Sequence, residues 1–319
     1  MSNRLALGVD VGGTKIAIAL VDGKLGVSER IDVPSFATDG FELWGRIADA
    51  ATEILSKANG EVVGIGIGSA GPIYPIPGTV SPVNIPVWRD FPLVKCFQDV
   101  FQIDRVTLHG DAMALAHAEH KIGAGVGSRN MLGIVVSTGI GGGLIIDNEL
   151  FDGETGNTSY FGHSSIDFQG KKCACGRTGC VEAYASGPNM VALAKELGWR
   201  GTSDSFIDVA AAARTGDVAA LQAIETGSKA LAVGLVNFVG SLDIGHVVIG
   251  GGVAQAGDIY WAPLMKHIQA ECEYYGFLRD LKVSPAKLTT DAGLIGAASA
   301  SPAALAAART SPWRSCCAL

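Results

Sequence analysis

The sequence has no surplus of basic residues. Its 319 residues include 24 lysines and arginines against 31 aspartates and glutamates, so the net charge is −7 and the isoelectric point is near 5.4. Proteins that bind nucleic acids usually present a basic face to the phosphate backbone. The charge balance therefore argues against a nucleic-acid partner.

The sequence also shows no pattern typical of a leader peptide or of a membrane-spanning segment. Arg4 and Asp10 fall within the first ten residues, where a signal peptide would need a basic start and then a long apolar stretch. The uncharged run 62–88 contains five glycines and five prolines, which a lipid-exposed helix could not accommodate. We expect a cytoplasmic protein with no membrane contact.

Cysteine is scarce, and three of the seven cysteines stand close together. Cys173, Cys175 and Cys180 follow His163, with glycines between the last two thiols. One imidazole and three thiolates form a ligand set that tetrahedral Zn²⁺ prefers. The alternative is a disulfide with one spare thiol, although a Cys-x-Cys pair bridges poorly. The pattern predicts a zinc site.

Glycine is the residue in excess. The chain has 43 glycines, about 13% against a usual value of about 7%, and they cluster in short turns. Such turns let backbone amides approach a ligand. With 48% apolar residues, a chain of this length can bury a large core and suits one large domain or two lobes.

The first glycine turn lies within Gly8-Val9-Asp10-Val11-Gly12-Gly13-Thr14-Lys15. A Walker A loop leads into a helix, whereas this turn leads into a β-type run and so joins two antiparallel strands. The turn amides and the Thr14 hydroxyl are suited to cradle phosphate oxygens, with Lys15 beside them and Asp10 facing Mg²⁺ through water. A hairpin that binds nothing is the alternative.

A glycine cluster directly after a predicted strand occurs twice more in the sequence. A strand over 131–137 runs into the turn Thr138-Gly139-Ile140-Gly141-Gly142-Gly143, and Gly250-Gly251-Gly252 follows a predicted strand over 246–249. Each turn alone has a structural alternative. Together they indicate an internal duplication and predict the α/β fold of the actin-like ATPases (ribonuclease H-like), with two lobes around a cleft that holds ATP.

Helices are expected over 41–58, 183–197, 227–240 and 261–270, with Asp39 and Glu42 as a capping box for the first. We place the amino-terminal lobe at 1–118, the carboxy-terminal lobe at 119–300 and a tail at 301–319.

The motifs resemble those of the ROK family of bacterial sugar kinases and sugar-responsive repressors. The resemblance covers about residues 5–300 and is carried by DVGGTK, GDAMALAHAE, STGIGGG, CACGRTGCVEAYASG, VVIGGGV and AGLIGAA. It implies that Asp111, between a predicted strand over 106–108 and a helix over 112–121, is the catalytic base. From the residues alone, an ordinary helix N-cap is the alternative, and the two roles are compatible.

The resemblance also implies a sugar site formed by Asn84, Asp111, His163 and Glu182. His163 would bind zinc through one ring nitrogen and face the sugar with the other, so the metal holds the ring and has no open position for chemistry. For Glu182, a solvated position on a helix is the alternative.

Two departures from the family pattern concern the choice of sugar. Many members have Glu-Asn-Asp where this chain reads His109-Gly110-Asp111. Glucokinases of the family have Glu-x-Gly-His, and Tyr160 stands here in place of the carboxylate. The segment 175–187 also resembles bacterial N-acetylmannosamine kinases.

We therefore expect an ATP- and Mg²⁺-dependent kinase that phosphorylates the 6-hydroxyl of glucose or a related hexose. N-acetylmannosamine is the alternative acceptor, and polyphosphate is not excluded as a donor. A non-catalytic sugar-sensing protein is the alternative from another class. A repressor would carry a helix-turn-helix segment before the first strand, which begins here at Leu5. The resemblance also implies a homodimer or a dimer of dimers.

Overall fold

The computed structural model describes residues 3–300, so the tail predicted over 301–319 lies outside the described residues. The described chain folds into two compact units. Residues 3–111 and 293–300 form the first, and residues 112–292 form the second. The division differs from the lobes expected from sequence because residues 293–300 return to the first unit.

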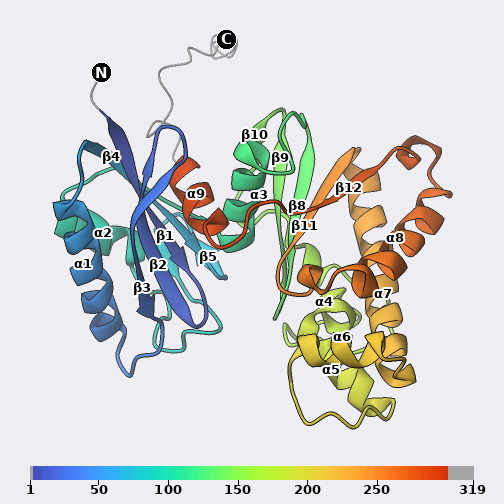
Figure 1. Cartoon of the computed structure of the whole chain (residues 1–319). Helices are drawn as coiled ribbons and strands as arrows, with labels where there is room; N and C mark the ends of the chain where they lie inside the picture. Colours follow the sequence, from blue (N-terminus) through green and yellow to red (C-terminus); the bar gives the residue numbers. More distant parts are fainter. Residues whose placement is uncertain (1–2, 301–319) are drawn as a thin grey trace. The chain divides into compact units, whose positions relative to one another are not determined.

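Each unit is built on a five-stranded mixed sheet of the same design (Figure 1). The strand order is β3-β2-β1-β4-β7 in the first unit and β10-β9-β8-β11-β12 in the second. In both, the first three strands are antiparallel neighbours and the last three run parallel. The first-unit strands are β1 (Arg4–Val11), β2 (Lys15–Asp22), β3 (Val27–Pro34), β4 (Glu61–Ser69) and β7 (Val106–Gly110). The second-unit strands are β8 (Met131–Val136), β9 (Ile140–Ile146), β10 (Glu149–Leu150), β11 (His246–Gly250) and β12 (Lys282–Pro285). The predicted duplication is confirmed.

The remaining elements surround these sheets. A small hairpin in the first unit consists of β5 (Ile73–Tyr74) and β6 (Thr79–Val80). The helices are α1 (Gly40–Ser56), α2 (Leu93–Phe101), α3 (Asp111–Ile122), α4 (Glu182–Ala185), α5 (Gly187–Glu196), α6 (Phe206–Arg214), α7 (Val218–Leu242), α8 (Asp258–Cys272) and α9 (Ala292–Ser299). Three short 3-10 helices are η1 (Phe161–His163), η2 (Ala254–Ala256) and η3 (Gly276–Leu278).

The first sheet has one face of large side chains and one of small ones, because side chains alternate along a strand. The large face, with Leu7 and Ile18 among others, packs on α1 in the main core of this unit. The small face packs on α9, which lies on the opposite side of the sheet from α1 and α2 (Figure 1). A Cβ on Gly8 would lie 2.6 Å from the carbonyl oxygen of Leu294. This close fit is why residues 293–300 belong to the first unit.

Helix α1 begins where the capping pattern predicted. The Asp39 carboxylate accepts hydrogen bonds from the amides of Phe41 and Glu42, at 2.8 and 2.9 Å. Two amides that have no partner within the helix are thereby satisfied. The first residue of the helix also binds Trp88, because the Gly40 carbonyl accepts a hydrogen bond from the indole nitrogen at 3.0 Å.

The second sheet repeats the arrangement with α3 on its small face (Figure 1). A Cβ on Gly141 would lie 2.8 Å from the Ala112 Cβ, and one on Gly143 would lie 2.6 Å from the Met113 Cα. Residues 141–143 were predicted as part of a turn, and this was wrong, since they lie inside β9. Helix–sheet contact accounts for Gly141 and Gly143 without any ligand.

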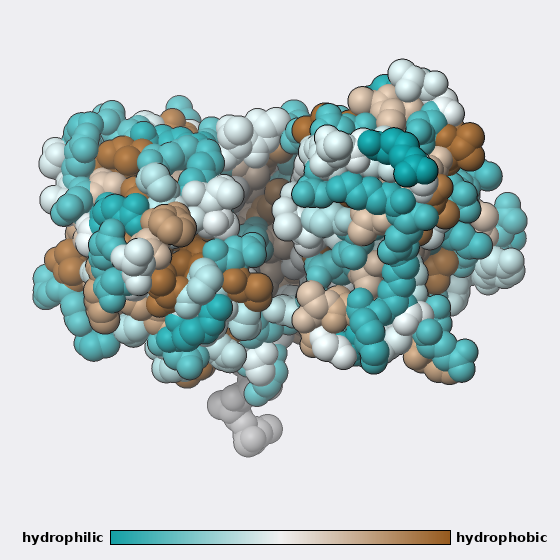
Figure 2. Space-filling view, turned by 90° about the horizontal axis from the view of Figure 1, so that it is seen from below, coloured by the Kyte–Doolittle hydropathy of each residue, from teal (hydrophilic) through white to brown (hydrophobic). Residues whose placement is uncertain are grey.

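None of the helices within residues 3–300 is long and apolar enough to cross a membrane. The face in Figure 2 is mostly hydrophilic and carries apolar residues in small groups.

Candidate active site

The first glycine turn connects β1 and β2, as predicted. The Gly12 amide donates to the Lys15 carbonyl at 3.1 Å and closes the turn. Ser35 holds the tip from β3, because its amide donates to the Thr14 carbonyl at 3.1 Å and its hydroxyl to the Gly13 carbonyl at 2.7 Å. Gly13, Thr14 and Lys15 are exposed. The turn is thus rigidly held and open to a ligand.

Lys15 has an anionic partner that sequence reasoning missed. Its ammonium lies 2.6 Å from the Asp32 carboxylate, which also accepts a hydrogen bond from Arg30 at 2.8 Å. The hydrogen bond from Arg30 is the main reason why the pKa of Asp32 lies below its usual value. The register of β2 and β3, which pairs Ala17 with Asp32, puts that carboxylate diagonally opposite Lys15.

Asn84 lies against the first glycine turn. A Cβ on Gly13 would lie 2.9 Å from the Asn84 Cβ and 3.0 Å from its amide nitrogen. Asn84 is exposed, so its amide is accessible to a small molecule. The structure therefore brings together two regions that were predicted separately, one for phosphate and one for sugar.

Two predicted carboxylates lie at the carboxyl edge of the first sheet. Asp10 is near the end of β1, and Asp111, which is exposed, follows β7 and begins α3. Burial, followed by the negative charge of Asp111, raises the pKa of Asp10 to about 6. Asp10 also touches Gly293 at the start of α9, where a Cβ would collide with its carboxylate. A divalent cation beside Asp10 would relieve the repulsion between the carboxylates.

We expect Asp10→Asn to raise the unfolding free energy in Mg²⁺-free buffer. A carboxyl group whose pKa is raised on folding destabilises the native state above that pKa, and the penalty fades as the pH falls toward the unfolded value. A rise from 3.8 to about 6 corresponds to about 1 to 3 kcal/mol at pH 8 and about half of that at pH 5. Urea unfolding of both proteins at the two pH values measures this gain in unfolding free energy. The exposed Asp99→Asn is the control, and an equal gain at the two pH values would contradict the assignment.

The second glycine turn connects β8 and β9. The Ser137 amide donates to the Gly139 carbonyl at 2.9 Å, and the Gly187 amide at the start of α5 donates to the Ser137 carbonyl at 2.9 Å. Thr138 is exposed at the tip. Of the residues predicted to bind nucleotide here, Thr138 and Gly139 lie in the turn and Gly141 and Gly142 in the strand. The sequence did not identify Ser137 and Gly187 as residues whose hydrogen bonds hold this turn.

The third glycine cluster meets the second turn. Gly250 ends β11, and Gly251 has a φ of +94° and lies so close to the Val136 carbonyl that no Cβ would fit. A Cβ on Gly252 would lie 3.7 Å from the Ser137 hydroxyl. The second unit therefore presents two glycine turns side by side.

The four predicted metal ligands converge. One ring nitrogen of His163 and the sulfur atoms of Cys173, Cys175 and Cys180 all lie within 4.8 Å of one another. The Cys175 and Cys180 sulfurs are 3.7 Å apart, and so are the Cys173 sulfur and His163 Nδ1. Two thiolates on a tetrahedral zinc ion would be about 3.8 Å apart, given a Zn–S bond of about 2.3 Å. These cysteines are free thiols, so the donor set and its geometry fit zinc better than the disulfide alternative.

Protons on the buried thiols of this cluster compete with a metal ion for the sulfur atoms. Burial, followed by hydrogen bonds with the other thiols, raises the pKa of Cys180 to about 12. Burial also raises the pKa of Cys173. A metal must therefore displace protons from both thiols, so its affinity falls as the pH is lowered.

Tyr160 and Glu182 lie beside the metal ligands. The rings of Tyr160 and His163 are 5.2 Å apart, and one oxygen of Glu182 lies 3.9 Å from His163 Nδ1. The side chain of Glu182 is only 18% exposed, so the alternative of a solvated helix position is wrong. The structure therefore groups three of the predicted sugar-site residues within the second unit.

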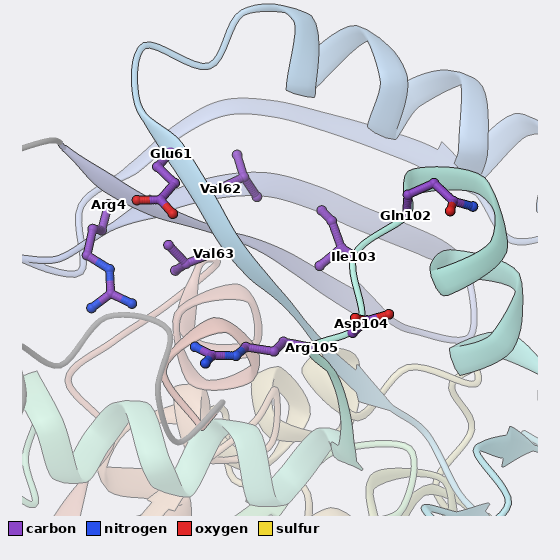
Figure 3. A pocket seen from close by; sticks show the side chains of 8 residues that line it. All are labelled: Arg4, Glu61, Val62, Val63, Gln102, Ile103, Asp104 and Arg105. Atoms are coloured by element: carbon purple, nitrogen blue, oxygen red, sulfur yellow. The ribbon is translucent and has the colours of Figure 1, made fainter.

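One cavity of the first unit, of about 490 Å³, lies at the edge of its sheet opposite to the edge that carries Asp10 and Asp111 (Figure 3). Arg4, Glu61 and Arg105 surround it, where β1, β4 and β7 begin. It contains none of the predicted site residues. Ligands of parallel sheets bind at the carboxyl ends of the strands, where Asp10 and Asp111 lie, so this cavity is not the candidate active site.

Comparison with known proteins shows the family of this chain. The sequence model of the ROK family matches residues 6–303. The chain belongs to the ROK family. This ROK protein is 33% identical to a glucokinase of Halalkalibacterium halodurans over 93% of its own length and 94% of the relative's. It is also 33% identical to an N-acetylmannosamine kinase of Salmonella arizonae over 92% of its own length and 96% of the relative's.

The ROK protein is similar in structure to a ROK family glucokinase from Streptomyces griseus in complex with glucose and AMPPNP. The TM-score is 0.77 at 31% identity, covering 92% of this chain and 98% of the other. The α/β fold of the actin-like ATPases, predicted from the duplicated glycine turns, is thereby confirmed.

Proposed function

We propose that this ROK protein is an ATP- and Mg²⁺-dependent kinase that phosphorylates the 6-hydroxyl of glucose or a related hexose. The observation that carries the proposal is Asp111, an exposed carboxylate that follows β7 and begins α3 at the same edge of the sheet as Asp10.

Asp111 accepts the proton of the sugar hydroxyl as that oxygen attacks the γ-phosphorus, and the bond from this phosphorus to the β–γ bridging oxygen breaks to release ADP. Phosphoryl transfer passes through a loose transition state, so the base mainly orients the nucleophile. The position at the start of α3 stabilises the ionised carboxylate through the helix dipole. Asp10 is the residue that would hold Mg²⁺, and the bound ion would supply positive charge to the phosphates.

Backbone amides bind the phosphates of ATP. We assign this role to the exposed turns at Gly12, Gly13, Thr14 and Lys15 and at Thr138 and Gly139, with Gly250, Gly251 and Gly252 beside the nucleotide. Gly141 and Gly142 take no direct part in this assignment, because they lie in β9.

His163, Cys173, Cys175 and Cys180 would hold Zn²⁺ in a structural role. Four protein ligands would leave no open coordination position, so the metal would fix the imidazole instead of activating the substrate. His163 Nδ1 faces the thiols, which leaves Nε2 for a sugar hydroxyl. Asn84, Asp111, Tyr160 and Glu182 complete the proposed sugar site.

The decisive test is an ADP-release assay with MgATP and a panel of sugars that includes glucose, mannose, N-acetylglucosamine and N-acetylmannosamine. Turnover with any of them supports the kinase. Sugar binding by calorimetry without turnover, with ATP or polyphosphate as donor, would favour a non-catalytic sugar sensor.

The two acceptor classes are distinguished at Tyr160. We expect Tyr160→Glu to raise the kcat/KM ratio of glucose to N-acetylmannosamine by about 10-fold to 100-fold, since a hydrogen bond to a charged group contributes about 1.5 to 3 kcal/mol. Steady-state kinetics with both sugars measure the ratio.

Tyr160→Phe is the matched control, because it removes the hydroxyl and keeps the ring beside His163. An unchanged ratio in a folded, active Tyr160→Glu enzyme would remove Tyr160 from the sugar site.

A cytoplasmic location and a homodimer or dimer of dimers stay predictions from the sequence. Light scattering coupled to size-exclusion chromatography tests the assembly directly.

A further inference from the structure

Glu182 binds the second glycine turn. Its Oε2 accepts a hydrogen bond from the Ile140 amide at 2.7 Å, where β9 begins. A Cβ on Gly139 would lie 2.9 Å from the same oxygen, so the carboxylate is packed against the turn itself. A hydrogen bond from an amide to a carboxylate is about twice as strong as one between neutral groups.

The second oxygen of the same carboxylate lies near one residue of the metal cluster. Glu182 stands two residues after Cys180, and its Oε1 lies 3.9 Å from His163 Nδ1. His163 is 23% exposed at its side chain and Glu182 18%, so solvent screens this contact only in part. One carboxylate therefore has one oxygen 3.9 Å from the ring nitrogen of a metal ligand and the other hydrogen-bonded to the glycine turn.

The backbone after Glu182 reinforces this link. The Asn189 amide group donates to the Glu182 carbonyl at 3.0 Å and to the Ser186 hydroxyl at 2.7 Å. The next residue, Gly187, donates to the Ser137 carbonyl at 2.9 Å. Segment 182–189 thus holds both ends of the turn, at Ser137 and at Ile140.

We propose that Glu182 is a positioning residue that transmits metal occupancy of the Cys₃His cluster to the second glycine turn, and so sets the affinity for nucleotide. The proposal rests on the assignment of that turn to ATP. It gives Glu182 a role on the nucleotide side in addition to any contact with sugar.

The experiment compares Glu182→Ala and Glu182→Gln in nucleotide binding without sugar. Glutamine keeps a carbonyl oxygen for the Ile140 amide, whereas alanine removes the acceptor. We expect the Kd for MgADP, measured by calorimetry, to rise about 10-fold to 100-fold in Glu182→Ala and less than about fivefold in Glu182→Gln. Glu196→Ala, on the exposed side of α5, is the matched control and should bind as the wild type does.

Hydrogen exchange gives a readout that does not depend on activity. Peptides covering residues 137–145 should exchange faster in Glu182→Ala, and also in the wild type after the metal has been removed with a chelator. Wild-type exchange in both cases would overturn the proposal.

Two failures are distinguishable. Unchanged MgADP affinity in Glu182→Ala, with weakened sugar binding, would overturn this proposal and leave the kinase intact. A wild-type protein that binds no nucleotide would overturn the proposed kinase function and this inference with it.

Discussion

Asp111→Asn is expected to lower kcat by about 10² to 10⁴ while the affinity for sugar stays within about tenfold, because a general base contributes that much to the rate and the amide preserves the shape of the side chain. The pKa of Asp10 is raised mainly by burial and, after that, by the charge of Asp111, which this substitution removes. Steady-state kinetics give kcat, and calorimetry gives the sugar affinity without turnover.

Asp104→Asn is the matched control. Asp104 precedes β7, whereas Asp111 follows it, so the two carboxylates stand at opposite ends of one strand. The control should turn over normally. Retention of more than a tenth of wild-type kcat in Asp111→Asn would exclude Asp111 as the base.

Cys175→Ser is expected to lose the metal and, with it, the activity. Wild-type protein should contain one zinc per chain, and a hydroxyl is a poor replacement for a thiolate ligand. Cys175 is the exposed ligand, so the substitution itself disturbs packing least. Elemental analysis and the sugar assay on the same preparation measure both losses.

Cys96→Ser is the control, since Cys96 is a free thiol outside the cluster. It should keep both zinc and activity. Active wild-type protein without any metal would contradict the zinc assignment and require another role for the converging thiols.

Some interpretations from the sequence depended on residues close together in the chain, and these held. The β-type run that follows Gly12 and Gly13 predicted two antiparallel strands and the turn between them. The Asp39 cap and the clustering of the three cysteines near His163 were predicted equally well. In each case the determining contacts lie within a short stretch of chain, where spacing alone sets the geometry.

Interpretations that depended on distant contacts were less accurate. A single helix was predicted over 183–197, but the structure has α4 and α5, with Ser186 extended between them. The hydrogen bond from Gly187 to Ser137, fifty residues away in sequence, holds this break. Helix 227–240 was likewise only the carboxy-terminal part of α7, whose ends are capped by Asp217 and Asp243.

The sequence by itself determined the ROK motifs, the duplicated strand-turn-strand units and the identity of the residues that can hold zinc and phosphate. Only the tertiary structure decided what each of these residues touches. Burial beside Asp111 raised the pKa of Asp10, the packing of α3 explained Gly141, and Glu182 proved to bind the Ile140 amide. These effects arise between residues that are far apart along the chain, and such contacts leave no periodic signal in a single sequence.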